Sequence, residues 1–289
     1  MKIRYYINNV GDRVCSLWNE ALGCYVDASN IENKIKEAVY GDDPVTKDVS
    51  VELIKEASRE PINEDEWKRD VPLSLSPTKI VCLGVSYADH AKEFDQSAVV
   101  EPAIFLKALS ALCSSADPVL CPKGSTHLDY EIELALVIKK RLKNASVDEA
   151  AMAIAGYTLL CDYSEREYQL KRGGQWTKGK SYDSFAPVGP SLVTIDELGD
   201  GSGIPLELKV NGELRQMGNT SDLIWSVPRL VAYISQFMTL MPGDLISTGT
   251  PSGVAMGMSE PGYLRAGDEV EWGTPEIGWN KQVVEPDIS

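Results

Sequence analysis

The sequence is poor in the residues that build soft metal sites. It has only two histidines, His90 and His127, among 289 residues, which excludes a site made of three or more histidines of one chain. Its six cysteines show no Cys-x-x-Cys spacing, so neither a zinc cluster nor a disulfide framework is favoured. Cys82, Cys113 and Cys161 lie in apolar runs, and we expect them to be buried thiols.

Long apolar runs and an excess of positive charge are also absent. No stretch of about 18 apolar residues occurs, so we expect no membrane span. Residues 1–6 lack the apolar core of a signal peptide, and we therefore expect a cytoplasmic protein. The net charge of −15 disfavours nucleic acid and anionic membranes as partners. An anionic small-molecule substrate stays possible, since a bound metal and a few cations can reverse the field locally.

The patterning divides the chain into a small N-terminal region and a larger domain. Residues 1–72 contain short alternating stretches and two stretches with helical spacing, but no pattern that indicates chemistry. We assign them to a small α/β region with a role in packing or dimer contacts. Residues 73–289 contain every pattern that suggests a site, and we assign them to a catalytic domain.

Two carboxylates interrupt a predicted buried strand at residues 129–138. Because side chains alternate along a strand, Glu131 and Glu133 project from the same face, about 6.5–7 Å apart at the backbone. Two anions on one apolar face repel each other and lose hydration, which costs roughly several kcal/mol per uncompensated charge. A solvated edge, a pairing with Lys or Arg, or a divalent cation held by carboxylate oxygens would each relieve this cost.

A third carboxylate, Asp162, stands at the end of the next predicted strand. It is either the N-cap of a short helix over residues 164–170 or a further ligand of the same cation. Arg166 and Gln169 lie on one face of that helix, at positions i and i+3.

A solitary histidine follows the predicted strand 79–85. On a short helix, His90 and Glu93 are three residues apart and therefore neighbours on one face. They form either an exposed surface pair or a dyad in which the carboxylate orients an imidazole that takes a proton from water.

Two further segments are rich in glycine. Residues 173–190 lack the spacing of a phosphate loop, and their Lys180 could simply compensate the carboxylates, which competes with the metal interpretation. Residues 245–253 form a strand end rich in hydroxyls and glycine, which permits close backbone approach to a ligand.

The ordered set of motifs from Lys79 to Trp272 resembles the fumarylacetoacetate hydrolase family. The motifs that carry this resemblance are Tyr-Ala-Asp-His-x-x-Glu (87–93), Asp-Tyr-Glu-x-Glu-Leu (129–134), Asp162 with Arg166 and Gln169, Gly-Lys-Ser-Tyr-Asp (179–183) leading to Pro-Val-Gly-Pro (187–190), Val-Asn-Gly-Glu (210–213), and Pro-Gly-Asp-x-Ile-x-Thr-Gly-Thr-Pro-x-Gly-Val (242–254).

The resemblance implies an α+β, mainly β fold, a mixed β-sandwich roll with a small N-terminal α/β region, that forms a homodimer. It implies Mg²⁺ or Mn²⁺ held by the three carboxylates, and a small-molecule oxo-acid substrate. The implied activity is hydrolytic C–C cleavage of acylpyruvate-type 2,4-dioxo acids, with decarboxylation or keto–enol isomerisation as the alternative. The residues matched to catalysis are His90, Glu93 and Lys180, those matched to the metal are Glu131, Glu133 and Asp162, and those matched to substrate binding are Arg166, Gln169 and Thr250.

Two positions depart from the pattern of the family. Ala108 replaces a proline that often follows the lysine of a Phe-x-Lys segment, and Ala255 replaces a glycine. Neither is expected to contact the metal, so the departures bear on substrate contacts. A scaffolding protein that has lost its chemistry is a third interpretation, and the presence of His90, Glu93 and Lys180 argues against it.

Overall fold

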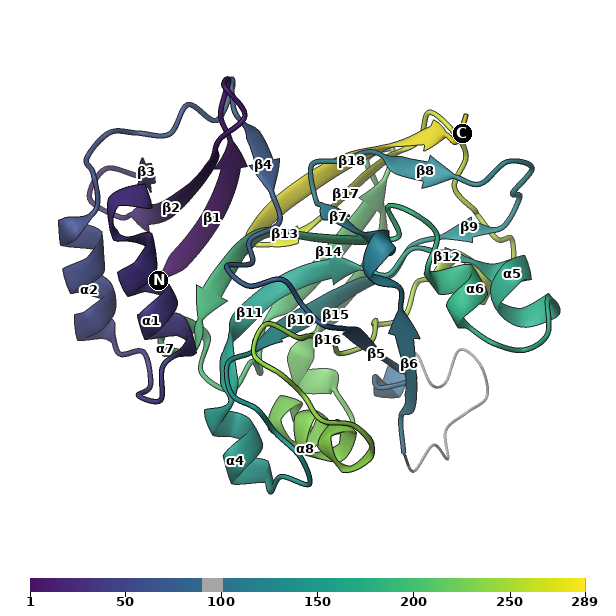
Figure 1. The fold of residues 1–289 in the computed structure, drawn as a ribbon. Coiled ribbons are helices and arrows are strands. Elements are labelled where there is room, and N and C mark those ends of the chain that lie inside the picture. Colours follow the sequence, from purple (N-terminus) through teal and green to yellow (C-terminus); the bar gives the residue numbers. More distant parts are fainter. Residues whose placement is uncertain (90–100, 289) are drawn as a thin grey trace.

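The computed structural model describes residues 1–89 and 101–288 of the chain (Figure 1). The N-terminal elements are β1 (Lys2–Ile7), β2 (Arg13–Asn19), β3 (Cys24–Asp27), η1 (Ser29–Ile31), α1 (Glu32–Tyr40), α2 (Lys47–Glu56) and β4 (Lys68–Asp70). The next elements are β5 (Ile80–Gly84), β6 (Ala103–Lys107), η2 (Leu109–Ala111), β7 (Leu112–Ser114), β8 (Val119–Cys121), β9 (Leu128–Asp129), β10 (Ile132–Ile138), α4 (Val147–Met152), β11 (Ile154–Cys161), β12 (Ser164–Glu165), α5 (Arg166–Lys171) and α6 (Thr177–Lys180). The last are β13 (Ala186–Thr194), α7 (Ile195–Leu198), β14 (Pro205–Val210), β15 (Glu213–Asn219), η3 (Thr220–Asp222), α8 (Val227–Phe237), β16 (Leu245–Ser247), η4 (Ala255–Gly257), β17 (Glu269–Thr274) and β18 (Gly278–Pro286).

An 11-stranded sheet forms the centre of the fold. Its main path runs β3-β2-β1-β13-β11-β10-β16-β5-β6, with β4 paired to β1 and β7 paired to β13. Every residue of β10 and β11 is buried, as expected for apolar strands that are covered on both faces. Their antiparallel register pairs Ile132 with Cys161, so the residues just before β10 and just after β11 meet at one end of the strands.

A five-stranded sheet, ordered β15-β14-β17-β18-β8, packs against the large sheet. Its β14–β15 hairpin turns at Asn211 and Gly212, with φ of 52° and 79°, as a two-residue turn with two positive φ angles requires. The Asn-Gly pair of the Val-Asn-Gly-Glu motif therefore forms the turn of this hairpin.

Helices accompany the large sheet in two places. Figure 1 shows α1 and α2 beside β1–β3, and α4 and α8 together at the bottom of the view, where they pack on each other. Ser146 and Glu149 form a capping box at the start of α4. No helix in the described part of the chain is long and apolar enough to cross a membrane.

One hydrophobic core runs through both sheets and the N-terminal region. Ile3 and Ile35 belong to the same buried cluster as Leu134 and Leu159. The α+β, sheet-rich architecture expected from the sequence is thus observed, and β1 joins β13 within the large sheet.

Candidate active site

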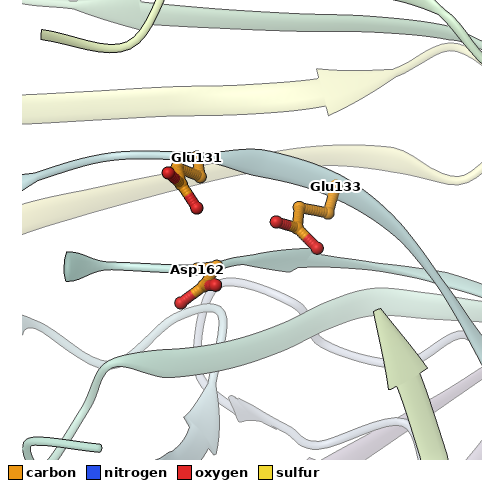
Figure 2. A group of neighbouring side chains, drawn as sticks. All are labelled: Glu131, Glu133 and Asp162. Atoms are coloured by element: carbon orange, nitrogen blue, oxygen red, sulfur yellow. The ribbon is translucent and has the colours of Figure 1, made fainter. Parts of the chain in front are cut away.

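Three carboxylates meet where β10 begins and β11 ends. Glu131 immediately precedes β10, Glu133 lies within it, and Asp162 immediately follows β11. The backbone N–H of Asp162 donates to the carbonyl of Glu131 at 2.7 Å, which fixes the two segments against each other. All three side chains are buried, one oxygen or more of each lies within 4.8 Å of the others, and Figure 2 shows the carboxyl groups turned toward one another.

Three buried cations surround two of these carboxylates. The Lys180 ammonium bridges Glu131 at 2.6 Å and Asp162 at 2.8 Å, which is the charge compensation that the sequence left open. Lys107, at the end of β6, pairs with the other oxygen of Asp162, and Arg166 reaches Glu131 at 2.6 Å. Burial acts to lower the pKa of Lys180, but Asp162 and Glu131 outweigh it and hold that pKa above its usual value. Lys180 is therefore an ammonium here.

Glu133 stands apart from these ion pairs. Within the described part of the chain, its carboxylate is bonded by neutral donors, namely the Ser247 hydroxyl at 2.5 Å and the Gly249 backbone N–H at 2.8 Å. Burial, followed by the charges of Asp162 and Glu131, raises the pKa of Glu133 well above its usual value. A buried carboxylate in this position gains most from an added positive charge.

A cavity of about 390 Å³ opens beside the carboxylates. Six of its lining residues form a polar half, namely Glu131, Glu133, Arg166, Gln169, Lys180 and Thr250. Six others form an apolar half, namely Leu83, Val85, Phe105, Leu170, Trp176 and Met256, and Gly84 completes the lining. The cavity therefore suits a small molecule that carries both an anionic group and an apolar group.

Arg166 and Gln169 are held in place by neighbours on both sides. The Arg166 Nη1 donates to Gln169 Oε1 at 3.0 Å, as their i, i+3 spacing on α5 predicts. Its Nε donates to Asp129 at 2.8 Å. Asp129 also accepts from the backbone N–H groups of Ala255, at 2.8 Å, and Met256, at 3.1 Å, so it connects the arginine to η4.

The Thr250 hydroxyl already makes two hydrogen bonds within the protein. It donates to the carbonyl of Ile132 at 2.9 Å and accepts from the Gln216 amide at 2.8 Å. A hydrogen bond from this hydroxyl to a substrate would require the bond to Ile132 to break first. Thr250 lines the cavity, and its role in binding stays a prediction.

Comparison with known proteins places this arrangement in a family. The sequence model described as fumarylacetoacetate (FAA) hydrolase C-terminal matches residues 79–285. The chain belongs to the fumarylacetoacetate hydrolase family. A Sphingomonas relative named 2,4-didehydro-3-deoxy-L-rhamnonate hydrolase is 46% identical over 225 residues, which cover 78% of this chain and 79% of that protein.

Solved structures of the family share the whole fold. A fumarylacetoacetate hydrolase from Exiguobacterium antarcticum is 30% identical, covers 99% of this chain and 100% of its own, and superimposes with a TM-score of 0.84. A 2-hydroxyhepta-2,4-diene-1,7-dioate isomerase from Mycobacterium marinum is 28% identical, covers 100% of both chains, and gives a TM-score of 0.76. The named members thus include hydrolases and isomerases, and the resemblance drawn from the sequence is confirmed.

The three carboxylates of this family member fit a hard dication. They offer oxygen donors alone, and Mg²⁺ and Mn²⁺ prefer such ligands over thiolates. Asp162 is also free of the capping role that was its alternative, because the N-cap of α5 is Glu165, whose side chain accepts from the N–H of Tyr168.

The structure brings together seven of the nine residues predicted for the site. The other two, His90 and Glu93, lie outside the described residues. Sequence reasoning missed Lys107 and Asp129 as part of the site. Asp129 carried a signal, since it begins the motif that contains both glutamates, and Lys107 ends the Phe-x-Lys segment of the family pattern, to which no role was assigned.

Proposed function

We propose that the protein is a divalent-metal-dependent hydrolase that cleaves a C–C bond in acylpyruvate-type 2,4-dioxo acids. The observation that supports this most is the buried trio of carboxylates at the polar half of the cavity, with one member, Glu133, bonded by neutral donors. A site of this charge accepts a dication and, with Arg166 and Lys180 beside it, an anionic substrate.

The name of the Sphingomonas relative supports the substrate class. That name describes a 3-deoxy sugar acid oxidised at carbons 2 and 4, which is a 2,4-dioxo acid. The distal group of such an acid occupies the apolar half of the cavity in this proposal, while its carboxylate and 2-oxo oxygens face the polar half.

Glu131, Glu133 and Asp162 would hold Mg²⁺ or Mn²⁺, which would supply Lewis-acid polarisation of the 2-oxo and carboxylate oxygens. Arg166, with Gln169 fixed beside it, orients the substrate carboxylate through charge-assisted hydrogen bonds. The Lys180 ammonium lies between Glu131 and Asp162, and in this proposal it stabilises negative charge as it develops on the substrate in the transition state.

The proton chemistry is assigned to His90 and Glu93 on the sequence alone. His90, oriented by Glu93, takes a proton from water, and the resulting hydroxide attacks carbon 4. The bond between carbons 3 and 4 breaks, and its electron pair leaves with carbon 3 as the enolate of pyruvate. Protonation of that enolate gives pyruvate, and carbon 4 becomes the carboxylate of the released acid.

Isomerisation or decarboxylation of a 2-oxo acid is the second candidate, favoured by the isomerase structures that match over the full length of the chain. Both reactions use the same enolate stabilisation without an attacking water. His90→Ala separates the hydrolase from a decarboxylase, because a hydrolase should lose most of its kcat, whereas a decarboxylase of oxaloacetate type should retain much of it.

A panel of 2,4-dioxo acids, oxaloacetate and a 2-hydroxydienedioate tests the proposal directly. We expect the enol absorbance of a 2,4-dioxo acid to fall with Mg²⁺ or Mn²⁺, pyruvate to form in equal amount, and a chelator to stop both. Turnover that resists the chelator, or no product from any member with either metal, would contradict the proposal. The homodimer implied by the resemblance stays a prediction. Size-exclusion chromatography with light scattering on the purified protein checks it.

A further inference from the structure

Two aromatic rings belong to the apolar lining of the central cavity. Phe105 on β6 and Trp176, the residue before α6, meet edge to face, with ring centroids 5.3 Å apart and an interplanar angle of 63°. Both rings also line a second, outer cavity of about 400 Å³ along β6 and residues 174–177. The pair therefore stands between two spaces of similar size.

The position of the indole depends on a glycine. A Cβ at Gly84, the last residue of β5, would lie 2.7 Å from the Trp176 ring carbon Cζ3, which is closer than real contacts allow. Glycine at this position lets the indole lie directly against the strand end. The next residue, Val85, also lines the central cavity and has φ of 60°, an uncommon backbone conformation for a β-branched side chain.

The aromatic pair lies next to the charged groups of the cavity. The Lys180 ammonium lies 5.2 Å from the centroid of the Phe105 ring, within range of a cation–π contact. A substrate whose charged end meets Lys180 and Arg166 therefore directs its other end at the two rings. The central cavity, at about 390 Å³, is near the lower end of the range of about 300–1,000 Å³ typical of ligand sites.

We infer that Trp176, which packs against Phe105 and Gly84, closes the part of the cavity that receives the distal acyl group of the substrate. It thereby sets the greatest length of that group. This inference rests on the proposed function, and it makes Trp176 a specificity-determining residue. Short, apolar acyl groups fit against the indole, whereas longer groups collide with it. Removal of the indole joins the central cavity to the outer one and lengthens the space available.

Trp176→Ala tests this inference on 2,4-dioxo acids whose distal group lengthens from acetyl to octanoyl. We expect the ratio of kcat/KM for the longest to that for the shortest substrate to rise about tenfold or more over the wild type. Trp176→Leu, which keeps an apolar side chain of intermediate size, should give an intermediate rise. Trp279→Ala is the matched control, because Trp279 is 44% exposed and lines a separate surface cavity. An unchanged ratio in both Trp176 variants would overturn the inference.

Measurements of ligand affinity distinguish a failure of this inference from a failure of the proposed reaction. Saturated 2-oxo acids of the same graded lengths carry no carbon-4 carbonyl and are not cleaved, so calorimetry with Mg²⁺ present reports their affinity alone. We expect Kd to rise with length in the wild type and to rise less, or fall, in Trp176→Ala. If no dioxo acid is cleaved but the Kd trend changes in this way, the proposed reaction is wrong, whereas the role of Trp176 in limiting the length of the ligand is supported. The same length dependence in both proteins, or no binding to either, would overturn the inference.

Discussion

Asp129 joins two walls of the cavity that lie far apart in the sequence. Its carboxylate accepts from Arg166 Nε and from the N–H groups of Ala255 and Met256, and the Tyr130 N–H completes the set. Because the side chain is fully buried, each of these bonds is made away from competing water. Asp129 thereby fixes the guanidinium at the angle from which it also reaches Glu131.

Asp129→Asn should weaken substrate binding through Arg166. The amide keeps the shape but loses the charge and one acceptor, so we expect KM to rise and kcat/KM to fall about 10- to 100-fold, which matches about 1.5–3 kcal/mol for hydrogen bonds to charged groups. Steady-state kinetics beside a thermal melt measures both effects. Asp65→Asn, at an exposed turn outside the site, is the control. An unchanged KM together with a lower melting temperature would assign Asp129 a purely structural role.

Lys107 shows why part of the site was beyond sequence reasoning. Its ammonium pairs with Asp162 and donates to the carbonyl of Tyr163 at 3.2 Å, although 55 residues separate it from Asp162. A lysine at the end of an apolar strand is common, and the sequence does not state which strands become neighbours. Glu131 and Glu133 could be paired from the sequence because strand geometry alone brings them together.

At the scale of elements, β16 and β5 run parallel, and Leu83 on β5 and Thr250 just after β16 both line the cavity. Asp244, in the turn before β16, accepts hydrogen bonds from the Thr78 N–H at 3.0 Å and hydroxyl at 2.6 Å. It also accepts from the ammonium of Lys79 and from the Met241 N–H. The Asp244 carboxylate thus ties the start of β5 to the start of β16.

The pH dependence of stability should show how much the hydrogen bonds of Asp244 contribute. Burial acts to raise the pKa of Asp244, but the bonds from Lys79 and Thr78 outweigh it and lower that pKa below its usual 3.8. A lowered pKa contributes stability that is present above the unfolded-state value and is lost as pH falls through the folded-state value. Asp244→Asn should therefore be less stable than the wild type at pH 6, and the difference should shrink below about pH 4. Urea unfolding at each pH measures it, and a constant difference down to pH 2 would contradict this account.

Local patterns predicted several elements and left their pairing open. The buried, mostly apolar run of β10, the capping box of α4 and the Asn-Gly turn of the β14–β15 hairpin each follow from residues close together in the sequence. The pairing of β1 with β13 joins Ile3 to Leu192, and no nearby residue specifies that contact. Tertiary packing decides it, because both strands bury the same apolar core.

At the scale of the whole molecule, the chain has a net charge of −15, and three of its carboxylates are buried together in the site. A dication bound by the folded state alone would stabilise it by mass action. We expect the melting temperature of the wild type to rise with the concentration of Mg²⁺ or Mn²⁺, and a chelator to reverse the rise.

Glu133→Gln should remove most of this dependence of stability on metal. Without metal, the variant should be more stable than the wild type by on the order of 1 kcal/mol, since a buried carboxylate bonded by neutral donors becomes an uncharged amide. With metal, it should gain little, because one of three ligands is lost. Differential scanning calorimetry with and without Mg²⁺ measures both effects. An equal metal-induced shift in the two proteins would place the bound ion elsewhere.

Anomalous diffraction from crystals grown with Mn²⁺ tests the central claim most directly. We expect one strong peak among Glu131, Glu133 and Asp162, with an oxygen of each carboxylate in its coordination shell. A map with no peak there, and with Lys180 alone bridging Glu131 and Asp162 at saturating Mn²⁺, would contradict the proposed metal-dependent chemistry.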